Sequence, residues 1–220
     1  MPRWYGRRAI QSARVSDRSF VRFGGLAGIL LAITSWVAVV AYYTVAKAGQ
    51  DIVGVQVFQF LYALIAFWAL FGIVAVYWVI RTQGEAWSFF ATVVGVVASI
   101  GTLTSSLYEI AYTRAIIGLP VDFASRLPTV SGTDPLNIAT FGLTGLWFLI
   151  ANVFLWRRTP AMPRLLVLLG FVAVADLFVG FFAALSGLEQ LVNLAGLIAG
   201  GVGGPLYWLW LGLRLRKIAT

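Results

Sequence analysis

The stretch that decides the fold reads LLVLLGFVAVADLFVGFFAALSG and covers residues 165–187. Its length matches the roughly 20 apolar residues that an α-helix needs to cross the hydrocarbon core of a bilayer. Asp176 is its single charged residue and lies at the middle. A central aspartate opposes insertion by about 2.5–3.5 kcal/mol, whereas each large apolar residue favours it by roughly 0.3–0.6 kcal/mol. Because large apolar residues fill most of the stretch, we expect this helix to insert.

The rest of the chain has the same character, since 60% of its 220 residues are hydrophobic and only 11% are charged. This composition is typical of an integral membrane protein. Apolar runs of spanning length recur along the chain and predict an all-α fold, a bundle of six transmembrane helices. The runs cover residues 23–46, 53–80, 86–112, 136–156, 165–187 and 190–213.

Most connections between these runs are short, which predicts antiparallel neighbours in an up-and-down bundle. Residues 113–135 are the exception, and loops of this length tend to be functional or disordered. The sequence therefore predicts a basic arm (1–22), a six-helix membrane domain (23–213) with an external loop (113–135), and a basic tail (214–220).

The formal net charge of +8 is distributed along the chain as the positive-inside rule expects. If the N-terminus is cytoplasmic, thirteen of the sixteen basic residues lie on that side, and Lys47, Arg114 and Arg126 lie outside. We therefore expect a cell-membrane protein with both termini in the cytoplasm. The same distribution argues against nucleic acid as a partner and favours anionic lipid headgroups beside the N-terminal arm.

The chain has no cysteine and no histidine, which removes disulfides, bis-histidine haem, a Ser-His triad and the usual zinc sites. Lys47 and Lys217 lie at the ends of apolar runs, which disfavours a buried Schiff base. A di-aspartyl hydrolase needs two acids at one depth, and only Asp176 qualifies. We therefore expect no cofactor, no metal and no enzymatic activity.

Asp176 shares one broad helix face with small residues, so we expect its carboxyl to point at another helix and not at lipid. These small residues are Ala173, Gly180, Ala183, Ala184 and Gly187. No basic residue lies at this depth, so a neutral carboxyl is the favoured state. Three roles stay open: a structural hydrogen bond between helices, a step in a proton or cation path, or a contact to a cationic or hydroxylated ligand.

The last apolar run contains GGVGGP over residues 200–205, and Pro205 predicts a kink or break there. The short link after residue 187 should pack this run against its predecessor and bring the break to the depth of Asp176. A broken helix beside a buried acid is typical of ion and substrate sites in transporters. The alternative is that Gly196 and Gly200 only let two helices pack closely.

Polar residues near the outer ends of other runs suggest a vestibule above Asp176. Glu109 shares a stripe with Thr102 and Ser105, although Arg114 or Arg126 could instead pair with this carboxylate. Asn137 is expected to cap or border its helix and Asn152 to make an interhelical hydrogen bond. The candidate ligand or ion path comprises Asp176, Gly200, Gly201, Gly203, Gly204, Asn193, Glu109, Ser105 and Gln59.

Three segments resemble a family of bacterial six-helix integral membrane proteins of unknown function. They are RFGGLAGILL (residues 22–31), FGLTGLWFL (residues 141–149) and PAMPRLLVLLG (residues 160–170). The resemblance implies a basic arm, a glycine-containing first helix and a proline-containing basic turn between helices four and five. It implies a fold and no established chemistry.

Two functional hypotheses follow. The first is a non-catalytic accessory or helix-packing subunit that binds a protein partner or a second copy, because buried ionisable groups are few. The alternative is a small proton- or cation-coupled transporter or channel that uses Asp176 and the broken helix at residues 200–205.

Overall fold

The computed structural model describes residues 4–46, 52–115, 134–158 and 162–220, and these parts of the chain are helical apart from short turns. No strand occurs among them. The elements are α1 (Trp4–Ala41), η1 (Tyr42–Ala46), α3 (Ile52–Ile80), η2 (Arg81–Gln83), α4 (Glu85–Ala115), η4 (Pro135–Asn137), η5 (Ile138–Leu143), α6 (Thr144–Arg158), α7 (Arg164–Leu185), α8 (Glu189–Ile198), η6 (Ala199–Gly203) and α9 (Gly204–Ile218).

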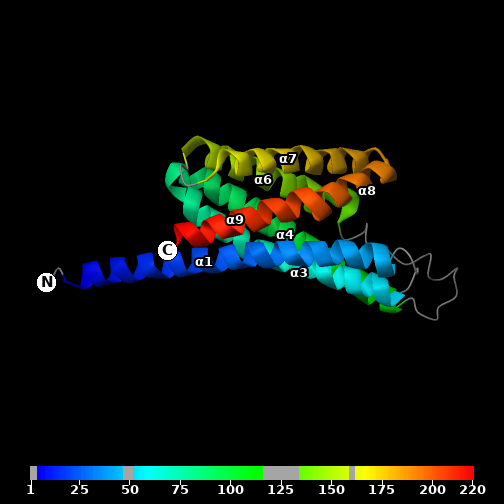
Figure 1. The fold of residues 1–220 in the computed structure, drawn as a ribbon, viewed down its shortest axis with the longest axis horizontal. Coiled ribbons are helices and arrows are strands. Elements are labelled where there is room, and N and C mark those ends of the chain that lie inside the picture. The colour runs from blue at the N-terminus through cyan, green and yellow to red at the C-terminus, as the bar shows by residue number, and fades with distance from the viewer. Residues whose placement is uncertain (1–3, 47–51, 116–133, 159–161) are drawn as a thin grey trace.

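Six helices are long and apolar enough to cross a membrane, which confirms the predicted all-α bundle (Figure 1). The last of these spans combines α8, η6 and α9 into one continuous element. The spans are Asp17–Val45, Ile52–Gln83, Glu85–Ala115, Ile138–Arg157, Arg164–Leu185 and Glu189–Ile218.

Helix α1 begins at Trp4, well before the apolar run predicted from residue 23. Arginine and alanine are good helix formers and are frequent in the arm, so the composition of the arm allows the helix to extend back to Trp4. The N-terminal part of α1 consequently projects beyond the rest of the bundle (Figure 1).

The six spans form a closed ring. Helix α1 packs against α3, α3 against α4, α4 against α6, α6 against α7 and α7 against α8. Helix α9 then returns to α1 and closes the ring. Because the number of spans is even, both chain ends lie at the same end of the bundle (Figure 1). Residues 116–133, most of the predicted external loop, lie outside the described residues.

Helix α7 ends at Leu185, two residues before the apolar run does. The amide of Leu188 donates to the Ala183 carbonyl at 2.9 Å, and the amide of Gly187 to the Ala184 carbonyl at 3.2 Å. This pattern is a Schellman motif, which needs a left-handed residue, and Gly187 supplies it with φ of 69°. The motif reverses the chain within a few residues and starts α8 beside α7.

Stacked tryptophans fill the ring toward the end that carries the two termini. The Trp147 and Trp208 rings are parallel within 2° with centroids 5.4 Å apart. Glycines make room for both indoles: a Cβ at Gly95 would lie 2.6 Å from Trp147 Cδ1, and one at Gly72 would lie 2.5 Å from Trp208. The bundle is therefore closed at this level by interlocking aromatic side chains.

Asn152 is fully buried and connects three helices. Its amide nitrogen donates to the Phe148 carbonyl at 2.8 Å, and its oxygen accepts from the Tyr207 hydroxyl of α9 at 3.3 Å. The predicted interhelical hydrogen bond is thus confirmed. Gly170 of α7 faces the same amide so closely that a Cβ there would overlap it.

We therefore expect Gly170→Ala to destabilise the protein by about 1–3 kcal/mol, the usual cost of overpacking a core. Thermal unfolding in detergent measures the effect. Gly200→Ala is the matched control, because a Cβ at Gly200 meets nothing within 4 Å. Equal melting temperatures for the two variants would contradict this account of the contact.

Candidate functional site

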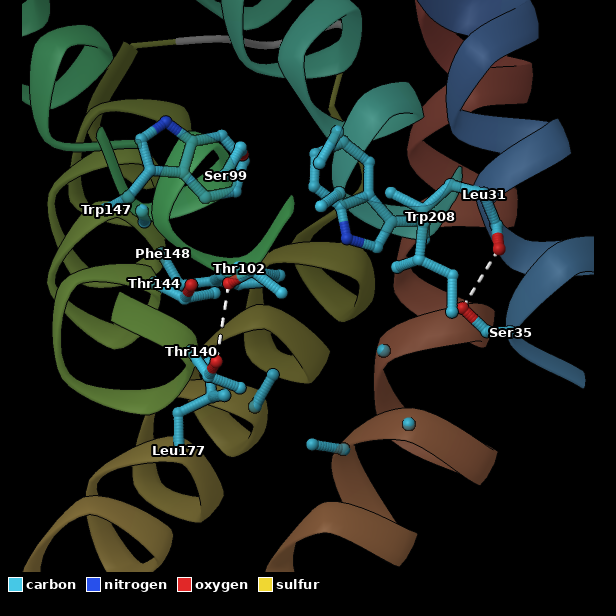
Figure 2. A pocket seen from close by; sticks show the side chains of 18 of the residues that line it. Leu31, Ser35, Ser99, Thr102, Thr140, Thr144, Trp147, Phe148, Leu177 and Trp208 are labelled. Atoms are coloured by element: carbon cyan, nitrogen blue, oxygen red, sulfur yellow. Dashed lines mark hydrogen bonds between the residues drawn. The ribbon is translucent and has the colours of Figure 1, made fainter. Parts of the chain in front are cut away.

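A cavity of about 140 Å³ lies inside the ring, and residues from all six spans line it (Figure 2). One residue from each span illustrates the enclosure: Leu31, Tyr62, Gly95, Thr140, Leu177 and Gly200. The wall is mostly apolar, and none of its lining residues is charged.

The cavity has two chemically different ends. The stacked indoles of Trp147 and Trp208 form an aromatic floor toward the terminal end of the bundle, whereas Thr140 and Leu177 lie at the opposite end (Figure 2). The rest of the wall carries hydroxyl groups. They belong to Ser35, Tyr62, Ser99, Thr102, Thr140 and Thr144. Because no lining residue is charged, this arrangement favours an uncharged guest.

The short π-helical segment η5 contributes Thr140 and Phe141 to the wall, and Asp134 fixes its geometry. The Asp134 carboxylate accepts hydrogen bonds from the Ala139 amide (2.7 Å), the Thr140 amide (3.0 Å) and the Thr140 hydroxyl (2.7 Å). Asp134 is buried. Because its carboxylate accepts the free amides at the start of this span, Asp134 acts as the cap of the span.

Asn137 borders this span, as predicted, but does not cap it. Asn137 and Leu136 adopt left-handed backbone angles, with φ of 54° and 58°, and no side-chain capping bond comes from Asn137. This reversal turns the chain so that Asp134, three residues earlier, faces the free amides at the start of the span. The Asp134-Pro135 pair was the available signal, because proline is favoured directly after a capping residue.

A second π-helical segment, η6, faces the same cavity and contains the predicted irregularity before Pro205. Proline has no amide hydrogen, so the Gly201 carbonyl four residues earlier loses its usual helical donor. The Trp36 indole of α1 donates to this carbonyl at 3.1 Å. The Gly204 amide bonds five residues back to Ala199, and a Cβ at Gly204 would overlap that carbonyl. The helix widens here and does not break.

Gly196 and Gly200 do not serve close packing between helices. A Cβ at Gly200 meets nothing within 4 Å, and one at Gly196 meets only Phe141, at 3.9 Å. Close packing instead occurs at other glycines, such as Gly24 against Ala75 and Gly212 against Gly25. Gly196 and Gly200 line the cavity, and their missing side chains leave space there.

Asp176 does not line the cavity, although Ala173 and Leu177 on either side of it do. It is half-buried, and its Oδ2 is buried without a hydrogen-bond partner among the described residues. Helix α7 contacts η6, as the predicted shared depth requires. The expected small face is only partly buried: Ala173, Gly180 and Ala183 are covered, whereas Gly187 is exposed.

The other candidate residues are dispersed. Gly200 and Gly204 line the cavity, whereas Gly201 and Gly203 do not. Asn193 is exposed on α8, Gln59 is half-buried one turn from Tyr62, and Ser105 is buried one turn beyond Thr102.

Glu109 is half-buried, and its Oε2 has no hydrogen-bond partner among the described residues. Arg114 is exposed, and the part of the chain that the structure describes contains no ion pair between it and Glu109. The other predicted partner, Arg126, lies outside the described residues.

Taken with the spans, this geometry defines a multi-pass membrane protein with a cavity, hereafter the chamber, inside the ring of its described helices. No protein-family model, curated protein or solved structure matches the chain. Its function therefore has to be inferred from the chamber itself.

The Trp36–Gly201 contact makes a testable prediction. Trp36→Phe should cost about 1–2 kcal/mol, because it leaves a carbonyl without a donor inside hydrocarbon. Pro205→Ala restores an amide at position 205, so Trp36→Phe should cost clearly less in that background. Thermal unfolding of the two single variants and the double variant gives the coupling energy. A coupling of zero would show that Trp36 does not act through the proline-freed carbonyl.

Proposed function

We propose that this chain is a non-enzymatic membrane protein that binds a small uncharged molecule in the chamber enclosed by its six helices. The observation that carries the proposal is that all six spans line this chamber and that none of its lining residues is charged. Two π-helical segments and three glycines contribute to the wall of this chamber, which imperfect packing alone does not explain. Such segments occur frequently at functional sites.

Saturable binding of benzene tests this proposal. We expect the protein in lipid nanodiscs to bind benzene in excess of protein-free nanodiscs, by equilibrium dialysis. Gly200→Leu should reduce this binding at least tenfold, because the new side chain occupies the chamber. Gly196→Leu is a second filling variant, since a Cβ there has only one distant neighbour. Val202→Leu, in the same segment but exposed, is the matched control.

A second candidate is an accessory subunit that packs against a partner through the α7–α8 hairpin. It is favoured by the half-buried carboxyl of Asp176 and the exposed amide of Asn193, two polar groups within the last two spans. The Glu189–Ile218 span is also the least buried of the six. Benzene binding that is absent, or unchanged in Gly200→Leu and Gly196→Leu, would reject the chamber and favour this candidate. Transport through Asp176 has less support, since the carboxyl lies outside the chamber wall.

We further propose that both termini are cytoplasmic in a cell membrane and that the basic arm lies near anionic headgroups. The distribution of basic residues supports this orientation. The cysteine-free chain allows a direct test with single introduced cysteines. Ser186→Cys, in the exposed α7–α8 turn, should react with an impermeant maleimide on intact cells, and Thr220→Cys only after permeabilisation. The reverse pattern would invert the orientation.

A further inference from the structure

The hydroxyl groups of the chamber are not interchangeable, because several have their protons committed elsewhere. Ser35 Oγ donates to the Leu31 carbonyl at 2.9 Å (Figure 2). Thr144 Oγ1 donates to the Ala139 carbonyl at 3.0 Å. A hydroxyl carries one proton and two acceptor lone pairs. These two groups therefore offer a guest only their acceptor lone pairs.

Thr102 and Thr140 belong to a directed chain of hydrogen bonds. Thr140 Oγ1 donates to Asp134 at 2.7 Å, and it lies 3.3 Å from Thr102 Oγ1 (Figure 2). The Thr140 proton is committed to the carboxylate, so Thr102 must be the donor in the second bond. When a hydroxyl group donates its proton in a hydrogen bond, its oxygen becomes more negative and accepts a further hydrogen bond more strongly. The Thr102 oxygen thus ends the chain as an acceptor that lines the chamber.

The remaining wall sets the size and polarity of the guest. The volume of about 140 Å³ is close to the roughly 150 Å³ of an engineered apolar cavity that holds benzene. Trp147 and Trp208 add aromatic surface to the wall, which suits an aromatic ring. A charged guest would meet no counter-charge among the lining residues.

We propose that the chamber takes an uncharged ligand of about one aromatic ring that carries a hydrogen-bond donor, and that this donor binds the Thr102 oxygen. This inference rests on the proposed function. Ser99 and Tyr62 make no hydrogen bond within the described residues, so their hydroxyls can donate or accept and tolerate an additional acceptor on the ligand. A ligand without a donor leaves the acceptor lone pairs of the Thr102 oxygen unused, although the Thr102 hydroxyl still donates to Thr140.

Pyrrole and furan test this selectivity, because they are five-membered rings of similar size and only pyrrole has an N–H donor. Binding of each to the protein in nanodiscs is measured by equilibrium dialysis against protein-free nanodiscs. Thr102→Val keeps the shape of the side chain and removes its oxygen. It should weaken pyrrole binding about twofold to tenfold and leave furan binding unchanged.

Two controls accompany this variant. Thr102→Ser retains the hydroxyl and should keep the affinity for pyrrole. Thr92→Val removes a hydroxyl from the same helix outside the chamber, where it donates to the Ser88 carbonyl, and should change neither probe.

The outcomes separate the two proposals. If Thr102→Val weakens both probes equally or neither, while Gly200→Leu still abolishes both, the chamber binds ligands but the donor assignment is wrong. If neither probe binds, or if Gly200→Leu and Gly196→Leu leave binding unchanged, the chamber is not a binding site and both proposals fail.

Discussion

A backbone carbonyl that loses its helical donor inside hydrocarbon must find another donor within the protein, because no water is available there. The structure meets this requirement at η6, where Pro205 withholds an amide and Trp36 supplies an indole N–H to Gly201. It meets the mirror requirement at η5, where the free amides of Ala139 and Thr140 find the Asp134 carboxylate. Both irregular segments can therefore exist at the chamber wall.

These two segments shape the chamber in different ways. At η6 and the end of α8, the absence of side chains at Gly200 and Gly196 provides space. In η5, Asp134 fixes the Thr140 hydroxyl and, through it, that of Thr102. Space and polarity thus come from separate spans, and the stacked tryptophans define the floor beneath both.

Hydropathy was sufficient to predict the six spans, because a bilayer imposes length and apolarity on each one separately. Residue chemistry predicted an irregularity before Pro205, as a kink or break, and the Asn152 hydrogen bond, since each follows from a single residue. The chamber was not predictable in this way. Thr102 and Thr140 meet across 38 positions of sequence, and no local pattern records that they share a wall.

Two kinds of glycine also look alike in a sequence. At Gly170 and Gly95 a side chain cannot fit, because another residue already occupies the position of the Cβ. At Gly200 the position of the Cβ is open space. A spacing such as that of Gly196 and Gly200 fits either case, and only the arrangement of neighbouring helices distinguishes them. Asp134 was assigned to an external loop because the reversal at Leu136 and Asn137 cannot be deduced from hydropathy.

The closure of α9 against α1 has a consequence for biosynthesis. The Trp36–Gly201 bond joins residues 165 positions apart, so it forms only after nearly the whole chain has been synthesised. The earlier helices can insert one after another and associate with their neighbours, but they leave an open crescent. The chamber comes into existence only when the last hydrophobic segment leaves the translocation machinery and seals that crescent against the first.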